Sequence, residues 1–252
     1  MKRLVLTLVC FAFVCVVKAQ FCATHVGTSL CYEIDNKKIN RVFKDTLYIH
    51  EVCKENGNLI IKEGASKVDP ETSSFIQIDS DSRTYYYGTD GITRVSIMNE
   101  EDGNNLINEL YNQSYKKAEP QKKMEVKANF EKIKKNFKCK GDAYILLDPN
   151  AKEGDKLPET EYVQKIKMIK LGTSIDKGIV EGHETLTTSA GTFDCIKVSY
   201  RAKIKMFLFS ETTYVTEWYA ENIGLVKSVE MDKDKNIISI QTLTSIESNK
   251  GL

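Results

Sequence analysis

The stretch Ile196-Lys-Val-Ser-Tyr-Arg-Ala-Lys-Ile-Lys-Met-Phe-Leu208 decides the fold class, because apolar and polar side chains alternate along it. The apolar residues stand at strict two-residue spacing, and from Lys197 to Lys205 the residues between them are lysine, serine and arginine. This period is typical of a strand with one buried and one wet face, and it cannot form a single stripe of a helix. The apolar face consists of Ile196, Val198, Tyr200, Ala202, Ile204, Met206 and Leu208.

A second strand signal lies nearer the N-terminus, where Phe43, Leu47, Ile49 and Cys53 share one face of a run that ends at Lys54. Asn56-Gly57 follows, and Leu59-Ile60-Ile61 resumes the apolar pattern. Both central residues of a type I′ turn need a positive φ, which Asn and Gly tolerate best. The sequence therefore predicts a β-hairpin turning at Asn56-Gly57.

Most of the remaining chain also has strand character, interrupted by turn-forming Asp, Asn, Gly and Pro residues. Residues 148–160, which contain Pro149 and Pro158, are expected to form a long loop. The further strand candidates are Leu30–Ile34, Phe75–Ile78, Thr84–Tyr87, Arg94–Met98, Ala143–Leu147, Tyr162–Ile169, Ile179–Thr188, Thr213–Tyr219, Gly224–Met231 and Ile237–Ile246.

Helical periodicity is clear in one segment only. Leu106, Ile107, Leu110, Tyr111 and Tyr115 form one stripe of a helix that should begin after Asp102-Gly103. Residues 124–138 fit both periods, and we expect a strand followed by a basic turn at Lys132–Lys135.

These patterns predict a mainly β fold: a large curved antiparallel sheet, either a partly open barrel or a sandwich, with one or two short helices. No repeat of 20–50 residues interrupts it. We expect residues 20–252 to form a single β-rich domain.

Residues 1–19 have the pattern of a secretory signal peptide. Lys2 and Arg3 precede an apolar run from Leu4 to Val17, and Val17-Lys18-Ala19 places small side chains at −3 and −1 of a cut after Ala19. We expect the protein to be exported to the periplasm, the cell surface or the extracellular space. No second long apolar segment follows, so no integral membrane span is expected after cleavage.

Cleavage would change the charge and cysteine counts. The whole chain has 36 Lys+Arg, 35 Asp+Glu and seven cysteines; residues 20–252 retain 33 bases, 35 acids and five cysteines. A net charge of −2 argues against a nucleic-acid partner. Five cysteines leave at least one without an intramolecular partner. Cys22 and Cys31, nine residues apart, are the predicted local disulfide, with buried free thiols as the alternative.

Catalytic and metal-binding motifs are absent from the sequence. His25, His50 and His183 are too scattered for a predicted metal site, and no CxxC, HExxH, GxSxG, Walker A or GxGxxG motif occurs. We therefore expect no enzyme activity, no metal and no cofactor. The basic clusters at Lys122-Lys123 and Lys132–Lys140 are interpreted as solvated surface rather than as a site for an anionic partner.

The long apolar face suggests a ligand-binding surface instead, if the concave side of the sheet is not completely filled. The alternative is that this face simply packs the core. The candidate ligand-binding residues are Ile196, Val198, Tyr200, Ile204, Met206 and Leu208.

An ordered series of motifs in the C-terminal half resembles a known family. The series runs from Gly154-Asp155-Lys-Leu157-Pro158 through Ala190-Gly191-Thr192-Phe193-Asp-Cys195 and Glu217-Trp218-Tyr219-Ala220 to Ile223-Gly224-Leu225-Val226. It is similar to the secreted domain-of-unknown-function family 3108-like of Bacteroidetes-type bacteria, over about residues 142–246. The resemblance implies an exported β-rich domain and supplies no catalytic residue.

Taken together, the sequence favours an uncharacterised, non-enzymatic, exported binding protein for an apolar or glycan ligand or an envelope partner. An exported hydrolase with an unrecognised carboxylate or cysteine site is the first alternative. A purely structural envelope component is the second.

Overall fold

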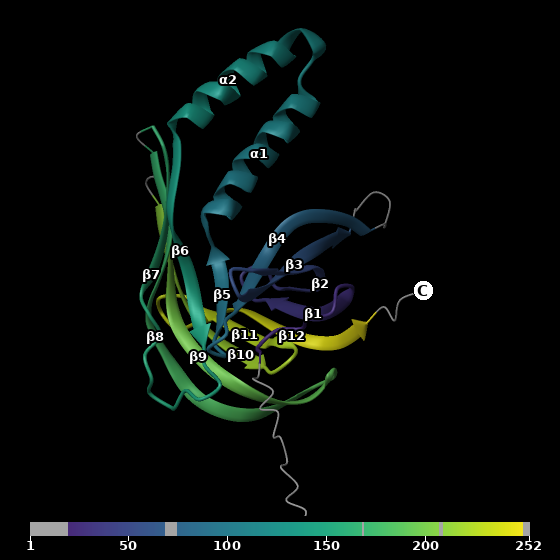
Figure 1. Cartoon of the computed structure of the whole chain (residues 1–252), viewed down its shortest axis with the longest axis vertical. Coiled ribbons are helices and arrows are strands. Elements are labelled where there is room, and N and C mark those ends of the chain that lie inside the picture. The colour runs from purple at the N-terminus through teal and green to yellow at the C-terminus, as the bar shows by residue number, and fades with distance from the viewer. Residues whose placement is uncertain (1–19, 69–74, 168, 207–208, 249–252) are drawn as a thin grey trace, which may run out of the picture.

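The strands, along which apolar and polar side chains alternate, close into a barrel. The computed structural model describes residues 20–68, 75–167, 169–206 and 209–248, so the predicted signal peptide lies outside the described residues. Within them, twelve antiparallel strands each pair with their neighbours in the sequence, and the first strand closes against the last (Figure 1). The strands are β1 (Thr28–Asn36), β2 (Arg41–Glu55), β3 (Asn58–Val68), β4 (Phe75–Tyr87), β5 (Thr93–Met98), β6 (Phe137–Leu147), β7 (Thr160–Ile166), β8 (Ile169–Thr188), β9 (Gly191–Met206), β10 (Phe209–Ala220), β11 (Gly224–Met231) and β12 (Ile237–Ser248).

The mainly β class is confirmed, and the barrel, rather than the sandwich, is the architecture. Apart from the segment within residues 124–138, the predicted strands fall in observed ones, although Phe75–Ile78 and Thr84–Tyr87 both belong to β4 and Tyr162–Ile169 contains the turn between β7 and β8. Asn56 and Gly57 have φ of 50° and 85°, as the predicted turn between β2 and β3 requires.

Connections between successive antiparallel strands alternate between the two ends of the barrel. The lower end has the Asn56-Gly57 turn, the 148–159 loop and the turns after β8 and β10. The upper end has the turns after β1, β7 and β11 and the helical insertion between β5 and β6. The lower end is sealed, whereas the upper end is open.

The helical insertion, here called the arm, consists of α1 (Glu100–Lys117), a 3-10 turn η1 (Pro120–Lys122) and α2 (Lys123–Asn136). It projects beyond the barrel as an antiparallel hairpin (Figure 1). Helix α1 begins at Glu100, before the predicted start, because Asn99 caps it. The Asn99 Oδ1 atom accepts hydrogen bonds from the Glu101 and Asp102 amides at 2.7 and 3.0 Å.

The predicted strand within residues 124–138 is wrong. Residues Lys123–Asn136 form α2, and the strand β6 starts at Phe137. Of the two competing periods, the helical one prevails because Val126, Phe130 and Ile133 can together face α1. The Phe130 ring stacks on Tyr111 with 4.2 Å between ring centroids.

The barrel core occupies the lower half of the interior. Its largest fully buried side chains include four tyrosines, namely Tyr32, Tyr85, Tyr162 and Tyr219, beside aliphatic residues from nearly every strand. Fully buried tyrosines need hydrogen-bond partners for their hydroxyls. For Tyr85 and Tyr219 these partners are the carboxyl groups of Glu63 and Glu217, which define the candidate site.

Candidate binding site in the barrel mouth

The lower end of the barrel is sealed by the segment before β1. Phe21, Cys22 and Ala23 are at most 6% exposed and belong to the core. The Phe21 amide donates to Thr93 Oγ1 at 3.1 Å, and the Ala23 amide donates to the Ile223 carbonyl at 3.1 Å. These bonds tie the segment to the start of β5 and to the turn between β10 and β11. A ligand of the barrel interior would therefore enter from the upper end.

A charged network crosses the interior at mid-height. Arg83 on β4 contacts Glu217 on β10, with 3.1 Å between its terminal nitrogen and Glu217 Oε1. The hydroxyls of Tyr200 and Tyr219 both donate to Glu217 Oε2 at 2.9 Å. Glu217 is 2% exposed, so its carboxylate is the buried acceptor on which three donors converge.

A second carboxyl group joins this network from β3. Glu63 pairs with Arg83 in the register of β3 and β4, and its Oε2 accepts a hydrogen bond from the Tyr85 hydroxyl at 3.1 Å. Tyr32 is also fully buried nearby and donates to the Leu225 carbonyl at 2.8 Å. We call Glu63, Arg83, Tyr85, Tyr200, Glu217 and Tyr219 the polar floor.

Protonation states in the polar floor follow from burial. Desolvation raises the pKa of the Glu63 carboxyl to about 7, although the Arg83 charge and the Tyr85 hydrogen bond oppose the rise. Burial and the Glu217 charge raise the pKa of Tyr200 well above its ordinary value, so its hydroxyl remains a donor. The floor is thus neutral overall when Glu63 is protonated, with Arg83 and Glu217 cancelling.

Above the floor, side chains that point inward become exposed to solvent. No register shift interrupts β9 against β10, so Ile204 faces the same side as Tyr200, which is buried. Ile204 is nevertheless 46% exposed, and Phe209, which shares this inner face from β10, is 77% exposed. Inward-facing side chains that remain exposed show that the barrel is open at this level.

Two more inward-facing apolar residues, one on β2 and one on β8, are exposed at the same level of the barrel. Phe43 on β2 lies in register with Ile34 on β1, on the face that includes buried Leu30 and Leu47, and is 44% exposed. Ile169 on β8 is 42% exposed and lies opposite Ile166 in the pairing of β7 with β8. The four residues Phe43, Ile169, Ile204 and Phe209 are called the mouth residues.

The predicted ligand-binding residues divide between these two levels. Ile196, Val198 and Tyr200 are buried in the filled lower barrel, where Tyr200 belongs to the polar floor. Ile204 lies in the open mouth. The Met206 side chain and Leu208 lie outside the described parts of the structure. The apolar face of β9 therefore packs into the core near Ile196 and lines the open mouth near Ile204.

The predicted Cys22–Cys31 disulfide is not formed, and both residues are free thiols. Cys22 is fully buried in the core at the lower end. Cys31 lies between Leu30 and Tyr32, which point inward, so it faces the outside of β1, where it accepts a hydrogen bond from Thr46 Oγ1 at 3.7 Å. Alternation along the strand therefore separates the two sulfurs.

The polar floor was missed by the sequence reasoning, although a signal for it existed. Glu217 stands at an inward position between Val215 and Tyr219, and Glu63 stands two residues after Ile61, which is buried. A charged residue at a position where alternation calls for an apolar one indicates a buried ionic interaction. The alternation does not indicate which strand carries the partner of such a charged residue.

A separate cleft of about 670 Å³ lies at the lower end, lined by residues that include His183, Glu184, Asp194 and Cys195. Burial raises the pKa of the Cys195 thiol to about 12, and the thiol donates weakly to the Phe193 carbonyl. Such a thiol is a poor nucleophile at neutral pH. Among the described residues, no cluster of three or more His, Cys, Asp or Glu side chains is arranged to hold a metal ion.

Comparison with known proteins identifies the family. Residues 92–243 match the DUF3108-like family. The chain belongs to this family. The match begins at the start of β5 and ends within β12, so it extends further toward the N-terminus than the predicted 142–246. It contains Tyr200 and Glu217 of the polar floor, whereas Glu63 and Arg83 precede it.

Two solved structures share the fold of this DUF3108-like chain. One is a protein of Parabacteroides distasonis, provisionally described as a lipoprotein, with 19% identity and a TM-score of 0.59 over 91% of this chain and 99% of that one. The other is a Bacteroides fragilis protein provisionally described as exported, with a YmcC-like fold, 16% identity and a TM-score of 0.58 over 91% and 100%. No curated protein matches the chain. None of the described helices is long and apolar enough to cross a membrane.

Proposed function

We propose that this DUF3108-like protein is an exported, non-enzymatic binding protein that takes an apolar ligand in the barrel mouth. The observation that carries the proposal is the exposure of the mouth residues. Apolar side chains that face inward, those of Phe43, Ile204 and Phe209, are exposed to water. They lie above the polar floor, below which the barrel interior is filled with side chains. Covering exposed apolar surface with a ligand is favourable by about 25 cal/mol per Å².

Export is supported by the signal-peptide pattern of residues 1–19 and by the descriptions of the two structural neighbours. The absence of catalysis is supported by the state of the candidate groups. Glu63 and Glu217 are at most 2% exposed, and both carboxyl groups accept hydrogen bonds from tyrosines. A hydrolytic carboxylate pair would need to reach substrate and water.

The test compares adjacent residues on opposite faces of β2. Phe43 points into the mouth, whereas its neighbour Val42 is 61% exposed on the outer face. The probe is N-phenyl-1-naphthylamine, a neutral apolar fluorophore that brightens in apolar surroundings. We expect the wild-type protein to bind it, and both F43E and I204E to weaken binding by about 10-fold, the loss expected when a charge is placed on an apolar wall.

The matched control V42E introduces the same charge one residue away and should bind the probe like the wild-type protein. Failure of the wild-type protein to bind the probe would overturn the proposal. Equal weakening by V42E and F43E would also overturn it, because binding would then not distinguish the two faces of the strand.

A further inference from the structure

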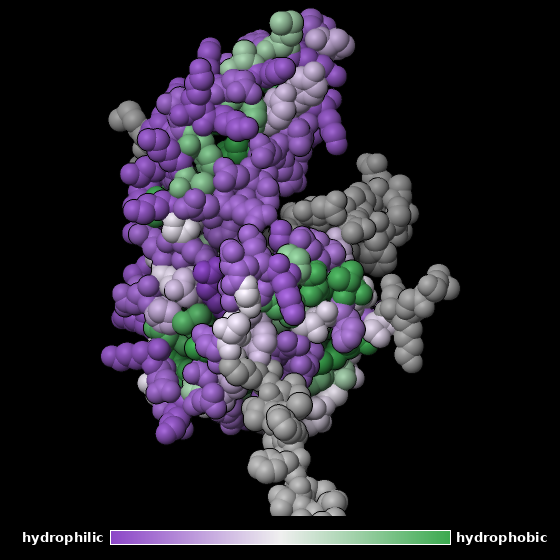
Figure 2. Space-filling model, viewed as in Figure 1, coloured by the Kyte–Doolittle hydropathy of each residue, from purple (hydrophilic) through white to green (hydrophobic). Residues whose placement is uncertain are grey.

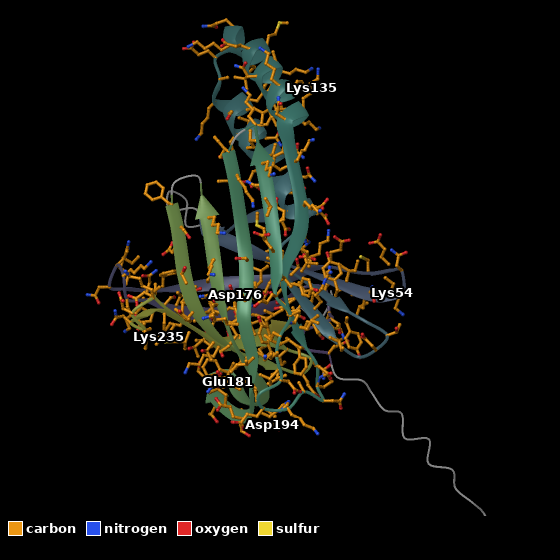
Figure 3. The ribbon with its side chains drawn as sticks, turned by 90° about the vertical axis from the view of Figure 1, so that its left-hand side faces the viewer. Lys54, Lys135, Asp176, Glu181, Asp194 and Lys235 are labelled. Carbon is orange, nitrogen blue, oxygen red and sulfur yellow. The ribbon has the colours of Figure 1, made fainter. Side chains whose placement is uncertain are left out.

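The part of the arm away from the barrel is rich in lysine. Residues 110–136 contain eight lysines, no arginine and three glutamates, a net charge of +5. Glu100, Glu101, Asp102 and Glu109 at the base of α1 reduce the net charge of the whole arm to +1. The tip between β7 and β8 adds Lys165, Lys167 and Lys170 next to α2. Figure 2 shows the polar surface of the arm, and Figure 3 places Lys135 at the opposite end of the molecule from Asp194.

Most of this charge is not neutralised within the protein. Among the described arm residues, Lys122 is the lysine that forms an ion pair, with Glu119 at 3.5 Å. Lys123 and Lys134 lie over the rings of Tyr115 and Phe130, at 5.1 and 6.0 Å from the ring centroids. These lysines therefore border the aromatic side chains of the arm and keep their charges in water.

An apolar groove runs between the two helices beside these lysines. It has a volume of about 360 Å³ and is lined mainly by Ile107, Tyr111, Val126, Phe130, Ile133 and Ile166. Helix α2 has no buried residue, and Ile133 is 38% exposed. An amphipathic helix of a soluble domain normally buries its apolar face against the core, and α2 does not.

The lysines follow one edge of the groove. At 100° per residue, Lys123, Lys127 and Lys134 fall within about 40° of one another on α2, next to the face formed by Val126, Phe130 and Ile133. An apolar face bordered by lysines is typical of helices that lie in a membrane interface, where the ammonium groups reach the headgroups. An acidic protein or a nucleic acid would use the charge but not the adjacent aliphatic groove.

We infer that the arm docks on the surface of a lipid bilayer that contains anionic lipids, with Lys123, Lys127 and Lys134 at the headgroups and the groove facing the acyl chains. This inference does not rest on the binding of a ligand in the barrel mouth. It assigns the arm a partner of complementary chemistry, and it accounts for a helical hairpin that contributes little to the core.

Sedimentation with vesicles tests the inference directly. We expect the full-length mature protein to bind phosphatidylcholine vesicles containing about 30% phosphatidylglycerol, and to be released when salt is raised to about 0.5 M. The triple variant K123E/K127E/K134E should lower the partition coefficient by at least about 10-fold. I133S should lower it less, because it removes an apolar contact and leaves the lysine charges in place.

The control K54E/K152E/K233E makes the same charge change on exposed lysines outside the arm, and Figure 3 shows Lys54 on the barrel. It should bind anionic vesicles nearly as well as the wild-type protein. Equal losses in the two triple variants would overturn the inference, as would binding to vesicles of pure phosphatidylcholine that matches binding to anionic ones. Binding to soluble polyglutamate without binding to anionic vesicles would also overturn it and assign the arm to an acidic protein.

Discussion

At the scale of single residues, Glu217 is the side chain on which the interior depends most. Its carboxylate accepts hydrogen bonds from Arg83, Tyr200 and Tyr219 in a part of the barrel that water does not reach. Removing one member of a buried ionic pair leaves the other charge without compensation, which costs about 3–5 kcal/mol. Removing both members costs much less.

We therefore expect E217L to lower the free energy of unfolding by about 3–5 kcal/mol, measured by urea denaturation. The double variant R83M/E217L should recover part of this loss, because the uncompensated guanidinium is then absent. E221L, a change of an exposed glutamate nearby, should alter stability by no more than about 0.5 kcal/mol. A double variant less stable than E217L would show that Arg83 does not depend on Glu217.

The raised pKa of Glu63 determines the direction in which this residue makes stability depend on pH. Its pKa of about 7 in the folded protein lies above the ordinary value of 4.5, so the folded state holds the proton more tightly. This contribution is complete below about pH 4.5 and is lost as pH rises through 7. The wild-type protein should therefore lose up to about 3 kcal/mol of unfolding free energy from this group between pH 5 and pH 8.

Equilibrium unfolding at a series of pH values checks this prediction. E63Q carries no titrating group at this position, so its stability should depend less on pH over the same range. E221Q removes an exposed carboxyl group and should retain the wild-type slope. A wild-type stability that increases between pH 5 and pH 8, or an E63Q slope equal to that of the wild-type protein, would contradict the account.

At the scale of elements, the arm is fixed to the barrel through the start of α1. The Asn99 side chain accepts two helix amides and donates to Ser96 Oγ at 3.2 Å, and Asp102 Oδ2 accepts the Asn99 amide at 2.7 Å. This reciprocal capping box satisfies amides that have no partner within the helix. It sets the point at which the chain leaves β5 and enters the arm.

We expect N99A to lower the free energy of unfolding by about 1–2 kcal/mol, because a helix N-cap and a buried hydrogen bond are lost together. Chemical denaturation followed by circular dichroism measures the change. N105A, at an exposed position in the same helix, provides the comparison and should be neutral or slightly stabilising, since alanine favours a helix interior. Equal effects of the two substitutions would remove the case for the cap.

Local sequence patterns predict the strands better than they predict the arm. Strand alternation is local, and it predicted a part of every strand from β1 to β12, but it missed the first half of β8 and placed a turn of the chain inside Tyr162–Ile169. The arm was harder, because residues 124–130 satisfy both the two-residue and the helical period. The choice depends on Tyr111, which stacks on Phe130 from the other helix, and local periodicity does not include this contact.

At the scale of the whole molecule, closure of the barrel creates what the sequence could not predict. Arg83 and Glu217 are 134 residues apart and meet only because β1 closes against β12 and brings distant strands to face each other across the interior. The unusual charges were visible in the sequence, whereas their pairing was not. The same closure explains why one alternating face is core at Val198 and open wall at Ile204.

Closure also gives the two ends of the molecule different roles. The segment around Phe21 and Cys22 seals the lower end, and the mouth residues leave the upper end open. The arm emerges from that same upper end, so a ligand bound in the mouth and a membrane contacted by the arm would be neighbours (Figure 1). The central claim is that the mouth holds an apolar ligand.

Native mass spectrometry of the protein extracted from its source cells tests that claim most directly. The account predicts an adduct of lipid size on the wild-type chain and on V42E, and its loss from F43E and I204E. A wild-type protein that shows only the bare mass of the processed chain, or an adduct that persists in both F43E and I204E, would contradict it.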